Sequence, residues 1–150
     1  MKRLVLVIAL LALLPGSATA HVSRAGSFGP FVTTWHIHGF DLQVTSNGSA
    51  YAVYRTYVFC SKQRHFGCDR FVGNNLYSGG VWYAQLRHPS STQVSGTVYA
   101  SAESALDGST IQLRLQPHGM LLLTQTAGGH ITRTKLCGPQ TPNPGSQCGA

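Results

Sequence analysis

Four cysteines carry the clearest chemistry in this sequence. In an exported chain, four cysteines are typical of two disulfide bonds, and they allow three pairings. The spacing favours two short loops, Cys60 with Cys68 and Cys137 with Cys148, although crossed pairings stay open. Closing loops of this size stabilises a fold by about 2 to 3 kcal/mol each. A zinc site is the weaker alternative, because the sequence has no C-x-x-C spacing.

Histidines suggest a second chemistry, metal binding. If a leader is removed after Ala20, His21 offers both its amino group and its ring to one metal ion, and nitrogen ligands of this kind suit Cu(II). His36 and His38 are alternate residues of one predicted strand face, so their rings can converge. Spacing alone is weak evidence for a metal site. We therefore expect no cofactor, with copper at His21, His36 and His38 as the alternative.

Residues for catalysis are few. The chain has only four aspartate and glutamate residues, which leaves little for a paired-carboxylate glycosidase. It has no G-x-S-x-G motif, and disulfide pairing removes every thiol nucleophile. We therefore assign no catalytic residue and expect a non-enzymatic protein. A hydrolase with a scattered serine and histidine set is the remaining enzymatic alternative.

The first 20 residues have the pattern of a signal peptide. Lys2 and Arg3 precede the apolar run 4–14, and the small residues 18–20 form a cleavage site. The run is shorter than the roughly 20 residues of a membrane span, which disfavours an uncleaved anchor. The predicted organisation is a signal peptide (1–20), an N-terminal arm (21–30), a single β domain (31–136) and a disulfide-pinned tail (137–150). We expect a secreted or envelope-associated protein with no transmembrane segment after cleavage.

Strands must position these residues, and the clearest strands flank Asn47-Gly48. This dipeptide between alternating apolar residues predicts a hairpin over residues 34–60 with a two-residue type I′ turn. Counting outward pairs Leu42 with Val53 and Val44 with Tyr51. Because side-chain direction alternates, one face is expected to face the core: Phe40, Leu42, Val44, Tyr51, Val53, Tyr57 and Phe59. The opposite face is mostly polar or small: Asp41, Gln43, Thr45, Ala50 and Ala52.

Gly39 interrupts this pattern. A glycine inside a strand often marks a bulge, which adds one residue and exchanges the two faces. We expect a bulge at or near Gly39, with Trp35 and Ile37 inward and His36 and His38 outward. Without it, both histidines would lie in the core and their rings would need partners.

The rest of the chain repeats short alternating segments, such as Val81–His88 with Trp82, Ala84 and Leu86 on one side. The segments recur at roughly ten-residue spacing with turn residues between them. This pattern predicts an all-β fold, an antiparallel meander of about seven or eight strands. A closed barrel is favoured over a sandwich, because closure leaves no sheet edge. The longest irregular connection is expected between residues 60 and 80.

Several segments together resemble one group of proteins. They are Thr34-Trp35-His36-Ile37-His38-Gly39, the hairpin end Tyr54–Cys60, Leu136-Cys137-Gly138 and the closing Cys148-Gly149-Ala150. These segments resemble small exported, disulfide-bonded proteins of mycobacteria and other actinobacteria, a group with no established function. The resemblance implies a bacterial, exported β domain with disulfide bonds. It implies no catalytic residue.

The barrel interior is the remaining candidate site, because small barrels can hold one ligand among inward aromatic and aliphatic side chains. The residues expected to line it are Trp35, Arg55, Tyr57, Phe59 and Trp82. For the aromatic residues, the alternative is a core filled by its own side chains. An unpaired charge on an apolar face is costly, so Arg55 meets an anionic ligand, pairs with one of the few acids or lies at the barrel mouth.

The formal net charge of +7 suits an anionic setting such as a cell envelope, although such a charge also serves solubility. The sequence therefore predicts an exported, non-enzymatic β-barrel that binds a small ligand or an anionic envelope component. It predicts no nucleic-acid partner. A copper-binding protein that uses His21 is the alternative function.

Overall fold

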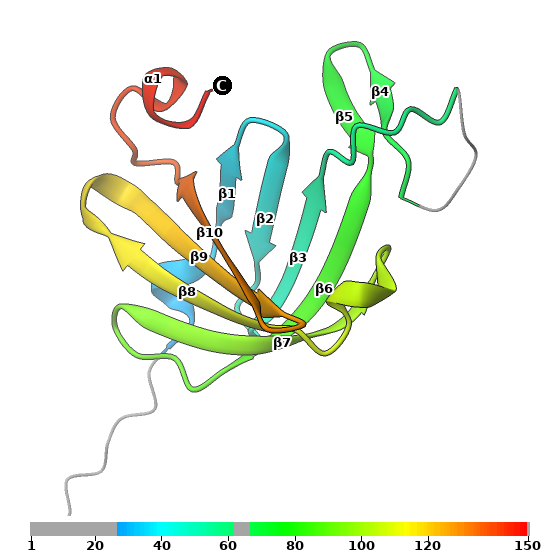
Figure 1. Ribbon diagram of the computed structural model, residues 1–150. Helices are drawn as coiled ribbons and strands as arrows, with labels where there is room; N and C mark the ends of the chain where they lie inside the picture. Colours follow the sequence, from blue (N-terminus) through cyan, green and yellow to red (C-terminus); the bar gives the residue numbers. More distant parts are fainter. Residues whose placement is uncertain (1–26, 62–66, 150) are drawn as a thin grey trace, which may run out of the picture.

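Eight antiparallel strands close into a barrel in the computed structural model, which describes residues 27–61 and 67–149 (Figure 1). The barrel order is β1-β10-β9-β8-β7-β6-β3-β2, and β4 and β5 form a separate hairpin inserted between β3 and β6. The predicted all-β meander and its barrel closure are confirmed. The strands are β1 (Thr34–Ile37), β2 (Phe40–Val44), β3 (Ser49–Tyr54), β4 (Arg70–Val72), β5 (Asn75–Ser78), β6 (Gly80–Arg87), β7 (Gln93–Ser101), β8 (Thr110–Gln116), β9 (Met120–Ala127) and β10 (His130–Cys137).

Short helical segments complete the described part of the chain. Three are single 3₁₀ turns, η1 (Gly29–Phe31), η2 (Ser104–Leu106) and η3 (Pro117–Gly119), and the fourth is the C-terminal helix α1 (Pro144–Cys148). The predicted signal peptide and His21 lie outside the described residues.

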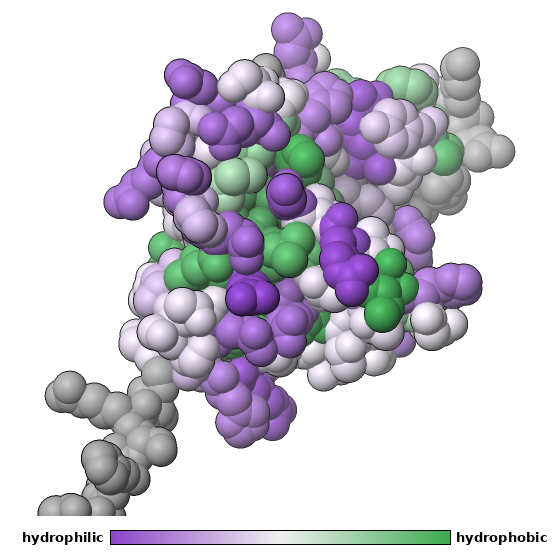
Figure 2. Space-filling model, turned by 60° about the vertical axis from the view of Figure 1, so that its left-hand side comes forward, coloured by the Kyte–Doolittle hydropathy of each residue, from purple (hydrophilic) through white to green (hydrophobic). Residues whose placement is uncertain are grey.

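The barrel interior is filled by alternate residues of its strands. In β6, Trp82, Ala84 and Leu86 are buried, as their predicted alternation requires. The other strands contribute inward side chains in the same way: Trp35, Leu42, Val44, Ala50, Ala52, Val94, Val98, Ile111, Leu113, Leu121, Leu123 and Leu136. Burying each larger aliphatic side chain of this kind contributes about 1.5 to 3 kcal/mol. On the face that Figure 2 turns forward, hydrophobic residues form a band across the middle, set among hydrophilic ones.

The hairpin around Asn47-Gly48 forms, but its predicted register is wrong by one residue. Its turn has three residues, 46–48: the Gly48 N–H donates to Thr45 O at 3.0 Å, and Gly48 has a φ of +81°. Leu42 therefore pairs with Ala52 and Val44 with Ala50. Because side chains alternate, a shift of one residue exchanges the faces of the whole second strand. Ala50 and Ala52 are buried, and Tyr51 lies outside.

The outward position of Tyr51 creates a row of aromatic rings on the barrel surface. Tyr51 of β3, Tyr83 of β6 and Tyr99 of β7 lie side by side, with ring centroids 5.1 Å apart for the first pair and 6.3 Å for the second. Cross-strand aromatic pairs of this kind stabilise a sheet.

Gly39 forms a turn and not the predicted bulge. Ile37 pairs with Phe40, so the chain reverses through His38 and Gly39, and Gly39 takes a φ of +73° that suits glycine. The expected faces are nevertheless found, because Trp35 is buried, Ile37 packs against the core and the histidines lie outside it. The first segments are thus two short strands of one hairpin.

Both disulfides form with the pairing that the spacing favours, Cys60–Cys68 and Cys137–Cys148. The second one attaches α1 to the end of β10. The His38 N–H also donates to Cys148 O at 2.9 Å, so the tail is held against the β1–β2 turn. Strand β3 ends at Tyr54 and not at the predicted Cys60, and the connection from 60 to 80 contains the β4–β5 hairpin.

Candidate functional site

The structure separates the five residues predicted to line a ligand site inside the barrel. Trp35 and Trp82 point inward and are buried among core residues, and the Trp35 indole N–H donates to Phe31 O at 2.9 Å. Arg55, Tyr57 and Phe59 follow the end of β3 instead, and Tyr57 is 69% exposed. The expectation that Tyr57 and Phe59 share a core face is wrong, because the register is shifted and the strand ends early.

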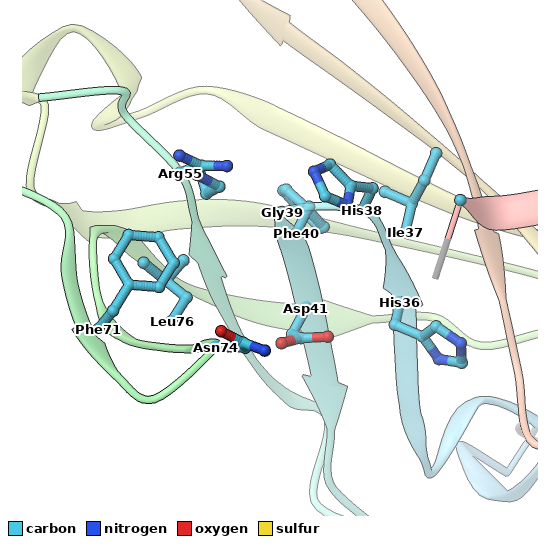
Figure 3. Close-up of a pocket in the computed structure, with 11 residues that line it drawn as sticks. His36, Ile37, His38, Gly39, Phe40, Asp41, Arg55, Phe71, Asn74 and Leu76 are labelled. Atoms are coloured by element: carbon cyan, nitrogen blue, oxygen red, sulfur yellow. The ribbon is translucent and has the colours of Figure 1, made fainter. Parts of the chain in front are cut away.

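The two strand histidines do not converge. His36 lies in β1 and His38 in the β1–β2 turn, and their rings point away from each other (Figure 3). Among residues 27–61 and 67–149, no group of three or more histidine, cysteine, aspartate or glutamate side chains is placed to hold a metal ion. Copper binding at His21 stays a prediction, since that residue lies outside the described part of the chain.

Asp69 organises the chain that follows β3. Its side chain is buried, and Oδ1 accepts hydrogen bonds from the Thr56 N–H (2.7 Å) and the Thr56 hydroxyl (2.9 Å). Oδ2 accepts from the Tyr57 N–H at 3.0 Å and lies 3.5 Å from Arg55 Nε. This ion pair is one of the alternatives expected for Arg55. A carboxylate with so many donors fixes the path of residues 55–57.

The main chain and a disulfide secure Asp69 from the other side. The Asp69 N–H donates to Val58 O at 2.6 Å, and the Cys60 N–H donates to Asp69 O at 3.1 Å. The Cys60–Cys68 disulfide ends at the residue before Asp69. The segment after β3 is therefore joined to the start of β4 by hydrogen bonds, an ion pair and a disulfide.

The pKa of Asp69 reflects two opposing effects. Burial alone raises the pKa, because it disfavours the charged form. The hydrogen bonds from Thr56 and Tyr57 and the nearby Arg55 guanidinium outweigh burial and hold the pKa below its usual value. Asp69 is therefore ionised at neutral pH, and its negative charge faces the Arg55 guanidinium.

The Arg55 guanidinium lies within cation–π distance of two aromatic rings. Its Cζ is 4.7 Å from the centroid of the Tyr57 ring and 5.2 Å from that of Phe71. Such cation–π contacts hold the planar guanidinium against the ring faces. Tyr57 reaches this position with a φ of +61°, which is rare for an aromatic residue and is maintained by the bond of its N–H to Asp69. Arg55 Nε is buried without a hydrogen-bond partner.

A groove of about 420 Å³ lies beside this arginine at the barrel rim. The β1–β2 hairpin, the segment after β3, the β4–β5 hairpin and the residue after α1 contribute its walls: His36, Ile37, His38, Gly39, Phe40, Asp41, Arg55, Phe71, Asn74, Leu76 and Gly149. In Figure 3, Asp41 and Asn74 point toward each other across one end, and Arg55 and His38 lie near the other. Phe71 and Leu76 form an apolar side wall.

Gly39 allows the arginine to approach this groove. The Arg55 N–H donates to Gly39 O at 2.8 Å, and a Cβ on Gly39 would lie 3.0 Å from Arg55 Cδ. The arginine stem thus packs on the turn, while its side chain stays 22% exposed. The groove combines an ordered cation, apolar walls and, at the far end, a carboxylate and an amide. Such a set can bind a small acidic molecule that also carries hydroxyl groups.

Sequence reasoning missed most of the groove. One feature of the sequence could have indicated Asp69. The chain has only four side-chain carboxylates, so an arginine on an apolar strand face has few possible partners. Phe71, Asn74 and Leu76 come from a hairpin within a segment expected to be irregular. No local pattern indicates that Asp41 and Asn74 face each other across the groove.

In the described part of the chain, no helix has the length and apolar character needed to cross a membrane. No protein-family model, no curated protein and no solved structure matches the chain.

Proposed function

We propose that this protein is an exported, non-enzymatic β-barrel whose rim groove binds a small acidic, hydroxyl-bearing molecule, free or as a unit of an anionic envelope polymer. The observation that supports this proposal is the Arg55 guanidinium, which contacts the rings of Tyr57 and Phe71 beside a groove of about 420 Å³. A volume of this size is typical of sites for small molecules.

The chemistry of the groove selects an acidic group. A guanidinium presents paired N–H donors that match a carboxylate or a phosphate, and charge-assisted hydrogen bonds of this kind are strong. Asp69 already balances part of the arginine charge, so hydrogen-bond geometry, more than net charge, provides the attraction. This predicts binding that weakens only moderately with salt, because a partly buried cation is little screened.

The remaining groove residues favour a ligand with hydroxyl groups and a carbon skeleton. Asp41 accepts hydrogen bonds, and Asn74 both donates and accepts them. Phe71 and Leu76 provide apolar contact for the faces of a ring. An acidic sugar such as a uronate carries all of these groups, which makes glucuronate a suitable probe.

Glucuronate titrated into ¹⁵N-labelled protein tests the proposal, with glucose as the neutral control and inorganic phosphate as a second anion. Amide signals of the groove should shift with glucuronate and not with glucose. Arg55→Gln should weaken binding by roughly tenfold or more, since it removes a charge-assisted pair. Arg114→Gln, at an exposed position of β8, is the matched control and should bind as the wild type does.

Two results would contradict the proposal. One is an absence of shifts in the groove with both anions. The other is an equal loss of affinity in Arg55→Gln and Arg114→Gln, which would indicate nonspecific charge attraction.

A further inference from the structure

The structure contains a second cavity, at one end of the barrel interior, and we propose that it is a separate binding site for a small apolar or aromatic molecule. The cavity has a volume of about 190 Å³. Phe40 borders both sites, but Arg55 does not line the cavity, so this inference does not rest on the proposed acidic ligand.

Three aromatic side chains form one wall of the cavity. Phe40 stacks on Tyr54 with ring centroids 6.2 Å apart, and Phe40 meets Trp82 at 6.4 Å with a tilt of 52°. Leu106 and Leu123 complete the apolar lining. The Tyr54 hydroxyl donates to Glu103 Oε1 at 3.0 Å, which holds its ring in place. An ordered aromatic wall of this kind suits a flat apolar guest.

The cavity exists because the apolar filling of the barrel stops before this end. In β9 the inward residues Leu121 and Leu123 are buried, and the next inward position is Gln125. In β10 the inward residue Leu136 is buried, whereas Thr134 and Thr132 precede it. Leucine at positions 132 and 134 would extend the core, but the threonine side chains there are too short to reach across the barrel.

The barrel seam leaves an entrance next to these threonines. Strand β1 has four residues and meets β10 through a single pair, His36 with Cys137. The segment 130–135 of β10 therefore has no partner in β1, and Thr132 is exposed. A small molecule can reach the aromatic wall there without separation of paired strands.

Size and lining determine what the cavity accepts. An apolar cavity of about 150 Å³ is large enough for benzene, so this one has room for a single substituted ring or a short branched chain. Gln125, Thr132 and Thr134 can bind one polar group of the guest near the entrance. The ligand class is a one-ring aromatic or similar apolar molecule with at most a small polar substituent.

Toluene is the probe for this site, with binding followed by saturation-transfer NMR and by amide shifts near Leu123 and Thr134. We expect saturable binding with a Kd of about 0.1 to 1 mM for a ligand of this size. Thr134→Phe fills the cavity and should weaken toluene binding by roughly tenfold or more. Thr97→Phe adds the same ring to the outer face of β7 and should leave binding unchanged. Arg55→Gln should also leave it unchanged.

Leu106→Ala provides a second test if Thr134→Phe does not fold. Leu106 lies in η2 and is only partly buried, so its truncation enlarges the cavity at small cost to the barrel. This variant should bind 1-methylnaphthalene, which the wild type should exclude. The inference is overturned if wild-type protein shows no saturable toluene binding, if folded Thr134→Phe and Thr97→Phe bind toluene equally, or if Leu106→Ala gains no affinity for the larger probe.

Discussion

Asp69→Asn tests how strongly one carboxylate holds the candidate site together. The substitution keeps the shape of the side chain and removes its charge. In the wild type, the two oxygens accept three hydrogen bonds, from the Thr56 N–H, the Thr56 hydroxyl and the Tyr57 N–H, and face Arg55 Nε. An asparagine amide has only one oxygen, so at least one buried donor would face an NH₂ group.

The expected loss is large for a single polar substitution. A buried donor left without a partner costs about 1 to 3 kcal/mol. Removing one partner of a buried ion pair costs about 3 to 5 kcal/mol, because the other charge remains. The effects overlap, since all donors share one carboxylate. We expect a decrease of about 3 to 5 kcal/mol in the free energy of unfolding at pH 7, against a total of about 5 to 15 kcal/mol for a domain of this kind.

The loss should depend on pH in a definite direction. The folded-state pKa of Asp69 is below its usual value, so the group stabilises the fold above the unfolded pKa of about 3.9. This stabilisation is lost as the pH falls through the folded pKa. The difference between wild type and Asp69→Asn should therefore be complete at pH 7 and shrink below about pH 4.

Urea denaturation between pH 2.5 and pH 7 measures this difference, with disulfides kept oxidised. Asp41→Asn is the control, because Asp41 is exposed on β2 and its substitution should change stability by less than about 0.5 kcal/mol. If Asp69→Asn unfolds at the same urea concentration as the wild type at pH 7, Asp69 does not hold the segment. A difference that stays constant from pH 7 to pH 2.5 would show that the charge is not the cause.

Three further changes test other parts of the fold. Ala52→Leu should lower the free energy of unfolding in urea by about 1 to 3 kcal/mol, because Ala52 is fully buried. Tyr51→Ala should lower it by about 1 kcal/mol or less, since Tyr51 lies on the outer face. The reverse order would contradict the register. Tyr83→Ala removes the middle ring of the tyrosine row and should lower the free energy of thermal unfolding by about 0.5 to 1.5 kcal/mol. Tyr99→Ala, at the end of the row, should lower it less. Equal losses would mean that the rings act separately. The double substitution Cys137→Ser and Cys148→Ser should lower the free energy of unfolding by about 3 kcal/mol. It should also speed hydrogen exchange of the His38 amide, which donates to Cys148 O. Unchanged exchange would show that the tail is held without the disulfide.

Local sequence pattern predicted the barrel strands and the disulfides, but not the exact geometry of the turns. Alternating segments separated by turn residues located the barrel strands, and loop length favoured the two disulfides that form. The hairpin register failed because Asn-Gly fits both a two-residue turn and the end of a three-residue turn. The alternation predicted Ala50 and Ala52 on the surface and Tyr51 in the core. The large Trp82 side chain inside the barrel needs small neighbours, however, and Ala52 pairs with Trp82 across β3 and β6.

The candidate site was largely beyond local pattern. Arg55 was identified as an anomaly on an apolar face, and its pairing with an acid was one of the alternatives. The acidic partner could not be chosen from the sequence, because main-chain hydrogen bonds to residues 58 and 60 and the Cys60–Cys68 disulfide bring Asp69 to Arg55. The left-handed backbone of Tyr57 has no sequence signal, since an aromatic residue rarely adopts it.

The arrangement of core and rim predicts which substitutions change binding as well as stability. Apart from the cavity at one end, the barrel interior is filled by its own side chains, whereas the groove is built by the segment after β3, the β4–β5 hairpin and the β1–β2 hairpin. Ala52→Leu should therefore lower stability and leave glucuronate affinity unchanged, since Ala52 does not line the groove. Asp69→Asn should lower both, because the same carboxylate that stabilises residues 55–57 places the Arg55 guanidinium. Glucuronate titration of the two folded variants separates these cases. If Ala52→Leu weakens binding as much as Asp69→Asn does, loss of stability alone controls binding, and the assignment of Asp69 as the residue that positions Arg55 fails.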